Sequence, residues 1–133
     1  MGEAGALDPA WRRRADHWAA VARERGTDAD VLHAQSRQLA ALYFMGYVVE
    51  AYAKALASAR GKSAKKIHEL MPLLEDCGIH RTDLPGDLRT YADERTVTMR
   101  YDPTLSPDID YATELARARR LAAYLGLRLR RLG

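Results

Sequence analysis

The chain has 133 residues, of which 47% are hydrophobic and 29% are charged, and its formal net charge at pH 7 is +3. This length provides one core but not two, so we treat residues 1–133 as a single domain with a core over about 9–127 and a basic end over 128–133. Cys77 is the only cysteine, which excludes an intramolecular disulfide and any metal site built from several cysteines of this chain.

The N-terminal segment and the apolar runs bear on where the chain resides. Residues Met1 to Pro9 are small and acidic, unlike a secretory signal. The longest apolar run, Leu39 to Val49, is shorter than the roughly 20 residues that cross a bilayer. These features, with the single cysteine, predict a cytoplasmic protein without membrane association.

Helix signals divide the N-terminal half into two segments. Asp8 before Pro9 is typical of an N-cap followed by proline at the first helical position, and Gly26 is typical of a helix end. The pattern therefore predicts a first helix over about Pro9 to Arg25. A second, longer helix is predicted from Asp28 or Asp30 to Arg60, because this stretch contains no proline.

The second segment is apolar around most of its circumference. A stripe at steps of three and four is joined by aromatic and β-branched residues on the other faces. Such a helix lies at the centre of its bundle or in a subunit interface. The stripe consists of Leu39, Leu42, Gly46, Val49, Ala53 and Leu56, and the added residues include Tyr43, Phe44, Tyr47, Val48 and Tyr52.

Three further helices are predicted in the C-terminal half. A short one starts near His68 and ends at Cys77 and Gly78, and a fourth ends at Tyr101 because Asp102 precedes a proline. The last helix is predicted to begin with Ser106 as its cap and Pro107 as its first residue. No segment alternates with a period of two, so we predict an all-α, up-and-down bundle of four to five helices.

The positive charge of the chain is concentrated at its C-terminal end. Residues 115–133 contain six arginines and no acid, so the rest of the chain is net negative. A basic helix of this kind is a candidate for phosphate contact. It is more typical of a solvated helix end, where cations are favoured by the helix dipole.

Two charged residues interrupt the most apolar segment. Glu50 and Lys54 are four residues apart, the spacing that lets them pair on one helix face. The pattern of the fourth helix places Arg95 on its inward face, from which a guanidinium group could bind a carboxylate at two points. The three residues form either an internal salt-bridge cluster that fixes helix register or the lining of a polar groove.

The glycine, glutamate and lysine pattern of residues 42–56 resembles the signature of the HEPN domain (higher eukaryotes and prokaryotes nucleotide-binding). Three further elements follow in the order of that family, and the resemblance spans roughly Val31 to Leu125. These elements are the basic loop before His68, the leucine run at Leu74, and the stretch from Arg95 to Pro103, which resembles the arginine, tyrosine and proline stretch of one branch.

The resemblance implies a helical bundle that forms a homodimer and, in many members, a metal-independent endoribonuclease. In such enzymes, an arginine and a following histidine act on the phosphate during attack by the ribose 2′-hydroxyl. Arg95 matches the motif arginine, whereas the histidine positions hold Arg100, Tyr101 and Asp102. The motif therefore has a cation, a phenol and a carboxylate but no group that titrates near neutral pH.

Two functions follow from this departure. In the first, the chain is a nucleotide-binding or RNA-binding module without the usual cleavage, in which Arg95, Arg100 and Lys54 contact phosphate and Glu50 and Asp102 support them. In the second, it is an active endoribonuclease toxin that uses Tyr101 or His68 in place of the missing histidine, and the resemblance implies a nucleotidyltransferase-type antitoxin as partner. A structural dimerisation scaffold is a third possibility. We predict no metal and no cofactor.

Overall fold

The computed structural model describes residues 7–63, 70–94 and 104–132. Within these ranges the chain forms five α-helices and one short 3-10 helix, and no strand, which confirms the all-α prediction. The elements are α1 (Pro9–Ala34), α2 (Gln38–Ala59), α3 (Leu70–Asp76), the 3-10 helix η2 (Arg81–Asp83), α4 (Gly86–Glu94) and α5 (Tyr111–Leu132).

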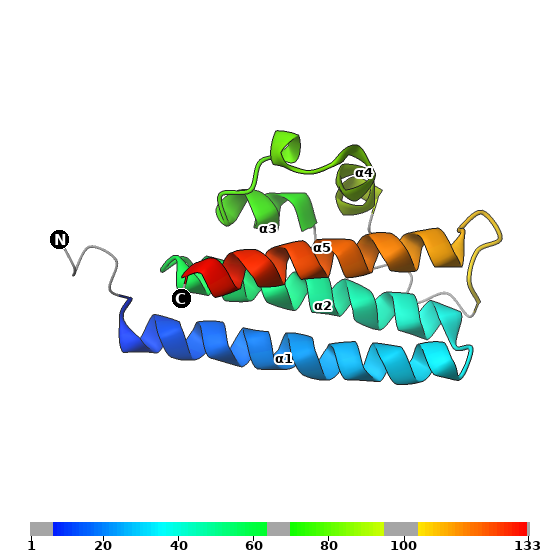
Figure 1. The fold of residues 1–133 in the computed structure, drawn as a ribbon, viewed down its shortest axis with the longest axis horizontal. Helices are drawn as coiled ribbons and strands as arrows, with labels where there is room; N and C mark the ends of the chain where they lie inside the picture. Colours follow the sequence, from blue (N-terminus) through cyan, green and yellow to red (C-terminus); the bar gives the residue numbers. More distant parts are fainter. Residues whose placement is uncertain (1–6, 64–69, 95–103, 133) are drawn as a thin grey trace.

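Three long helices make the body of the molecule. α1 and α2 form an antiparallel pair, and α5 lies along α2 and runs in the same direction as α2 (Figure 1). α3 and α4 lie together beyond α5, on the side away from α1. α5 packs mainly against α2 and also contacts α4.

α2 is the central helix, as its apolar circumference predicts. Thirteen of its 22 residues are buried, and it contacts α1, α3 and α5. Its length and hydropathy would also suffice for a membrane span, but the central helix of a helical bundle has the same properties. Within the fold, 61% of the most apolar 18-residue stretch of α2 is buried. The apolar faces of α2 are thus accounted for mainly by contacts within the chain.

The predicted end of the first helix at Gly26 is wrong. α1 continues eight residues further, to Ala34, and Gly26 lies in its interior with its Cα facing Val48 of α2. Ala22 and Ala29, on either side of the glycine, are buried against the bundle. Packing of this face against α2 outweighs the low helix propensity of one glycine, which is worth about 1 kcal/mol.

The connection between α1 and α2 lies at residues 35–37, so the predicted start of the second helix at Asp28 or Asp30 is also wrong. Ser36 has a φ of 58°, which reverses the chain. The amide of Gln35 donates to the carbonyl of Val31 at 3.1 Å, and that of Arg37 donates to Leu32 at 2.8 Å. These bonds satisfy the last carbonyls of α1, and neither glycine nor proline is needed at the turn.

The last helix starts later than predicted. Ser106 caps a short turn by accepting a bond from the amide of Asp108 at 3.3 Å, and α5 begins only at Tyr111. Asp110 caps α5 by accepting from the hydroxyl of Thr113 at 2.8 Å and from its amide at 3.5 Å. Ile109 packs against the core, which holds the turn on the bundle and delays the helix.

The short third helix ends close to the predicted position. α3 ends at Asp76, and Gly78 follows with a φ of +81°. The Gly78 amide donates to Glu75 at 2.9 Å, and the Ile79 amide donates to Leu74 at 3.0 Å. The predicted start of this helix at His68 and the predicted end of the fourth helix at Tyr101 lie outside the described residues.

Candidate functional site

Most residues that the sequence singled out for function lie outside the described residues. Two of them, Glu50 and Lys54, are described, both on α2. The proposed pairing of Arg95 with Glu50 and the phosphate contacts of the motif therefore stay predictions. The residues outside the described ranges are His68, Arg95, Arg100, Tyr101 and Asp102.

Glu50 and Lys54 pair as their spacing predicts. The Lys54 ammonium nitrogen lies 3.4 Å from Oε2 of Glu50, and the Glu50 residue is only 5% exposed. The same ammonium group lies 4.7 Å from the centre of the Trp18 ring on α1. Lys54 is thus held between a carboxylate and an aromatic face, an arrangement that stabilises the charge of a half-buried amine.

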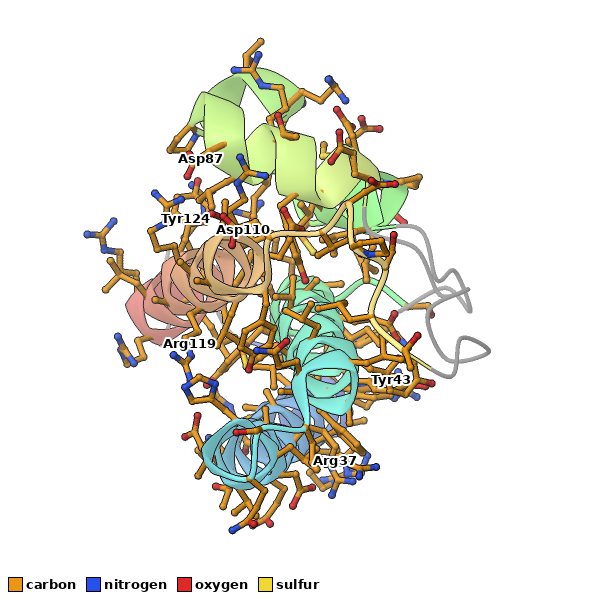
Figure 2. The ribbon with its side chains drawn as sticks, turned by 90° about the vertical axis from the view of Figure 1, so that its right-hand side faces the viewer. Arg37, Tyr43, Asp87, Asp110, Arg119 and Tyr124 are labelled. Atoms are coloured by element: carbon orange, nitrogen blue, oxygen red, sulfur yellow. The ribbon has the colours of Figure 1, made fainter. Side chains whose placement is uncertain are left out.

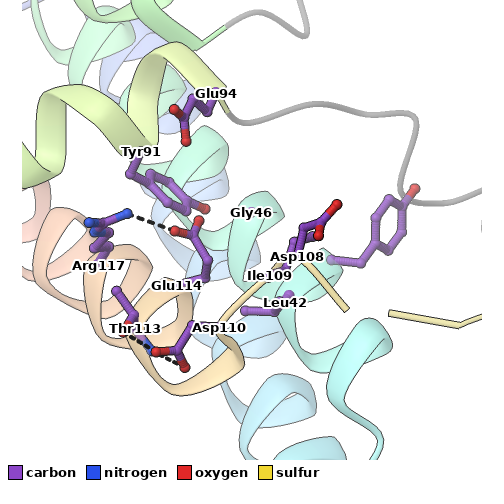
Figure 3. Close-up of a pocket in the computed structure, with 11 residues that line it drawn as sticks. Leu42, Gly46, Tyr91, Glu94, Asp108, Ile109, Asp110, Thr113, Glu114 and Arg117 are labelled. Carbon is purple, nitrogen blue, oxygen red and sulfur yellow. Dashed lines mark hydrogen bonds and ion pairs between the residues drawn. The ribbon is translucent and has the colours of Figure 1, made fainter. Parts of the chain in front are cut away.

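A hollow of about 440 Å³ lies elsewhere, between α2, α4, the turn at residues 108–110 and the first turns of α5. Figure 3 shows Tyr91 descending from α4 and Glu114 and Arg117 rising from α5 around it. We call this hollow the α4–α5 pocket. Its volume lies within the range of about 300–1,000 Å³ that small-molecule sites occupy.

The walls of the α4–α5 pocket are apolar and aromatic. Leu42 and Gly46 of α2 contribute to its lining, and Tyr91, 5% exposed, and Ile109 complete the apolar surface. Tyr43 also lines the pocket, and its hydroxyl shares a hydrogen bond of 2.5 Å with that of Tyr47. A flat ring could be held against such walls, because aromatic side chains offer a large rigid surface.

The rim of the pocket is acidic. Four carboxylates and one guanidinium group line it, and the Nη1 atom of Arg117 donates to Glu114 at 2.9 Å. Hydrogen bonds from Thr113 lower the pKa of the Asp110 carboxyl group, so this group stays ionised. The four acids are Glu94, Asp108, Asp110 and Glu114.

This combination determines what the pocket can hold. Carboxylates accept hydrogen bonds from N–H and O–H groups, whereas they repel a phosphate placed among them. A ligand that suits the pocket presents a flat ring and several donors. Any phosphate it carries must lie beyond the rim.

Histidines do not contribute to the described lining of the pocket. The Nδ1 atom of His33 lies 2.7 Å from the hydroxyl of Tyr111, and His17 stands edge to face with Trp18 at 5.4 Å between ring centres. Both are exposed. Within the described residues, no group of three or more histidine, cysteine or carboxylate side chains could hold a metal ion.

The sequence pointed to one wall of this pocket and missed the rest. Tyr91 is buried on α4 four residues before Arg95, the residue that the sequence placed on the inward face of the fourth helix. Three of the four rim acids come from a turn and from the start of α5, which were predicted as one continuous helix, and the fourth, Glu94, is the last residue of α4. The acids just before and within the first turn of α5, Asp110 and Glu114, were the available signal, but acids at a helix start are common for reasons unrelated to ligands.

One comparison with known proteins gives a match. A family model described as HEPN domain matches residues 10–125, from the second residue of α1 to within α5, and this range includes every residue that lines the α4–α5 pocket. No curated protein and no solved structure matches the chain significantly.

Proposed function

Because the chain belongs to the HEPN domain family, whose function relates in general to nucleotides or RNA, we propose that it binds a nucleotide or an RNA strand as a module without the usual cleavage. The nucleoside part occupies the α4–α5 pocket, and the phosphate lies outside its rim. The observation that carries this proposal is that Glu94 lines the pocket and Arg95 is the next residue in the chain.

The chemistry of the pocket supports a nucleoside. Tyr43 and Tyr91 provide surface for a base, and the carboxylates of the rim can accept from the N–H groups of the base and the hydroxyl groups of the ribose. The acidic rim disfavours phosphate inside the pocket, so a phosphate needs cations close by. Arg95 and Arg100, in the segment that follows Glu94, are the proposed phosphate contacts.

Lys54 takes no part in this arrangement. Its ammonium group is engaged by Glu50 and Trp18, and it does not line the pocket. The sequence has Arg100, Tyr101 and Asp102 where the family motif would have its histidine, and this favours binding over cleavage. Tyr101 and His68 belong only to the alternative, a metal-independent endoribonuclease toxin with a nucleotidyltransferase-type partner.

A homodimer is part of the proposal. Tyr43, Phe44 and Tyr47 form a half-buried aromatic cluster on α2, with ring centres of the first and last 4.8 Å apart. Aromatic surface of this kind is enriched in the central parts of protein interfaces. Sedimentation over micromolar concentrations measures the mass, and a monomer throughout would contradict the dimer.

The test compares uridine, uridine 5′-monophosphate and a short oligouridylate by calorimetric titration in the presence of a chelator. We expect the two phosphorylated probes to bind more tightly than uridine. The double change Arg95→Ala, Arg100→Ala should abolish that advantage and leave uridine binding unchanged. Glu94→Gln should weaken all three probes, whereas Glu75→Gln, an exposed change on α3, serves as the matched control.

The oligouridylate also separates binding from cleavage. Intact RNA after incubation with the folded protein is the expected result. Fragments that end in cyclic phosphate, lost in Arg95→Ala, would establish the endoribonuclease instead. Equal affinity of the parent and the double variant for the phosphorylated probes would refute the proposed phosphate contacts.

A further inference from the structure

A second hollow runs along the opposite side of α2, between α1 and α5. Its volume is about 530 Å³, and its floor is formed by Met45, Val48 and Tyr52 of α2. In Figure 2, Arg119 stands over this side of the molecule, and Tyr43, which lines the α4–α5 pocket, lies on the other side of α2. We call the hollow the α1–α5 groove.

Small residues form part of both walls of the groove. Ala22 and Gly26 of α1 face Ala122 and Gly126 of α5, each pair one helical turn apart. A methyl group added at Gly26 would lie 3.9 Å from Val48, and one added at Gly126 would lie 3.7 Å from the Tyr52 ring. Both glycines therefore lie against side chains of α2, and the absence of a Cβ atom keeps the walls of the groove free of larger side chains at these positions.

Arginines stand along both walls. Arg23 projects from α1, and Arg119 and Arg130 project from α5. Arg119 reaches Asp30 at 3.4 Å, an exposed contact of small energetic value. Within the described residues, the side chains of Arg23 and Arg130 contact no acid, so the groove has an excess of positive charge.

The remaining arginines of α5 are engaged elsewhere or lie outside the groove. Arg117 pairs with Glu114, Arg120 pairs with Asp87, and Arg128 contacts the hydroxyl of Tyr124 at 3.2 Å. Arg131 is exposed and does not line the groove. The excess positive charge at the groove thus comes from Arg23, Arg119 and Arg130, and the other arginines of α5 do not add to it.

We propose that the α1–α5 groove binds an amphipathic helix of a partner protein, with small apolar residues on one face and acidic residues along both flanks. The groove extends from Arg119 to Arg130, which corresponds to about 16 Å or three turns of helix. A helix seated there would place its apolar face against Tyr52, Gly26 and Ala123 and complete a four-helix bundle with α1, α2 and α5. Its acids would pair with the arginines on the two walls.

The groove suits nucleic acid and a second copy less well. Met45 and Val48 are almost fully buried, and the ring of Tyr52 packs against Gly126, so the floor offers little surface on which a base could stack. A symmetric contact with a second copy would bring the same arginines together and repel. The proposal is independent of the nucleotide site, because the groove and the α4–α5 pocket share no lining residue.

The test uses a stapled, fluorescein-labelled helical peptide with alanine and leucine on one face and glutamate on its flanks, measured by fluorescence anisotropy with the full-length protein. We expect saturable binding that weakens with salt. Ala123→Trp, which fills the groove from an exposed position without changing the charge, should weaken binding about tenfold or more. The double change Arg23→Gln, Arg130→Gln should have a similar effect.

Two controls make the result specific. Arg13→Gln with Arg131→Gln removes the same charge from exposed positions outside the groove and should change affinity by less than about twofold. A peptide with lysine in place of glutamate should not bind. Circular dichroism verifies that each variant is folded, and the nucleotide probes should bind Ala123→Trp as they bind the parent.

Three results would overturn the proposal. The first is equal binding of the acidic peptide by the parent and Ala123→Trp. The second is displacement of the peptide by an oligouridylate. If the oligouridylate itself no longer bound the Arg23→Gln, Arg130→Gln variant but still bound Ala123→Trp, the groove would be assigned to nucleic acid. The third is a dimer of the parent that Ala123→Trp converts to a monomer, which would assign it to a second copy.

Discussion

The ammonium group of Lys54 lies 4.7 Å above the Trp18 ring, which joins the C-terminal half of α2 to the N-terminal half of α1. Glu50 completes the arrangement one turn away on α2, at 3.4 Å. A charged side chain at a mostly buried position is tolerated when a carboxylate and an aromatic face both compensate for lost water. The polar residues in the apolar run of α2 thus have a structural explanation.

Replacement of Lys54 by methionine is expected to lower the free energy of unfolding by about 1–3 kcal/mol, because the aliphatic stem is kept and both polar contacts are lost. Urea unfolding measures the change. Lys62→Met is the matched control, since Lys62 is exposed, and it should stay within about 0.5 kcal/mol of the parent. An equal effect of the two changes would show that the contacts of Lys54 contribute nothing.

His33 and Tyr111 connect the end of α1 to the start of α5. Their side chains share a hydrogen bond of 2.7 Å and stack with ring centres 5.7 Å apart. We expect Tyr111→Phe to cost about 0.5–1.5 kcal/mol of stability, with a similar cost for His33→Ala. The double variant should lose less than the sum of the two, and strict additivity would mean that the pair is not coupled.

Two glycines should respond to alanine in opposite directions. Gly26 lies inside α1, and the added methyl group would meet Val48 at 3.9 Å, so Gly26→Ala should stabilise the protein by about 0.5–1 kcal/mol. Gly78 has a φ of +81°, and the added atom would lie 2.9 Å from Arg60, so Gly78→Ala should destabilise it by about 1 kcal/mol or more. Thermal unfolding distinguishes these signs, and a loss of stability in Gly26→Ala would show that the added methyl group disturbs the packing against Val48.

The fold class and the central position of α2 could be predicted because they follow from the period and extent of apolar residues, which packing obeys. Helix boundaries could not be predicted in this way. A glycine favours a helix end, and a serine followed by proline favours a helix start, but both are local preferences that packing can override. At Gly26 the buried alanines on either side kept the helix intact. At Ser106 the burial of Ile109 against the bundle produced a turn where the local pattern indicated a cap.

The candidate site was less accessible to sequence reasoning than the fold. Spacing on one helix identified the pairing of Glu50 with Lys54, because both partners lie on a single regular element. The α4–α5 pocket joins α2, α4 and the start of α5, and such contacts between distant segments leave no period in the sequence. The same holds for the α1–α5 groove, whose walls are two helices almost 100 residues apart.

The buried thiol of Cys77 gives the protein a specific dependence on alkaline pH. Cys77 is 0% exposed, its Sγ donates to the carbonyl of Ala53 at 3.0 Å, and burial raises the pKa of the thiol from 9.0 to about 11. The folded state therefore holds the proton more tightly than the unfolded chain. This contribution to stability is complete below pH 9 and is lost as the pH rises towards 11.

We expect the stability advantage of the parent over Cys77→Ala to fall by about 2–3 kcal/mol between pH 8 and pH 11, since each unit of pKa difference corresponds to about 1.4 kcal/mol. Urea unfolding of both proteins across this range measures it. Lysines and tyrosines titrate in the same window in both proteins, so the difference between the two curves isolates the thiol. Parallel curves would mean that the folded and unfolded thiols ionise alike, and rapid alkylation of the native protein by iodoacetamide at pH 8 would contradict the burial itself.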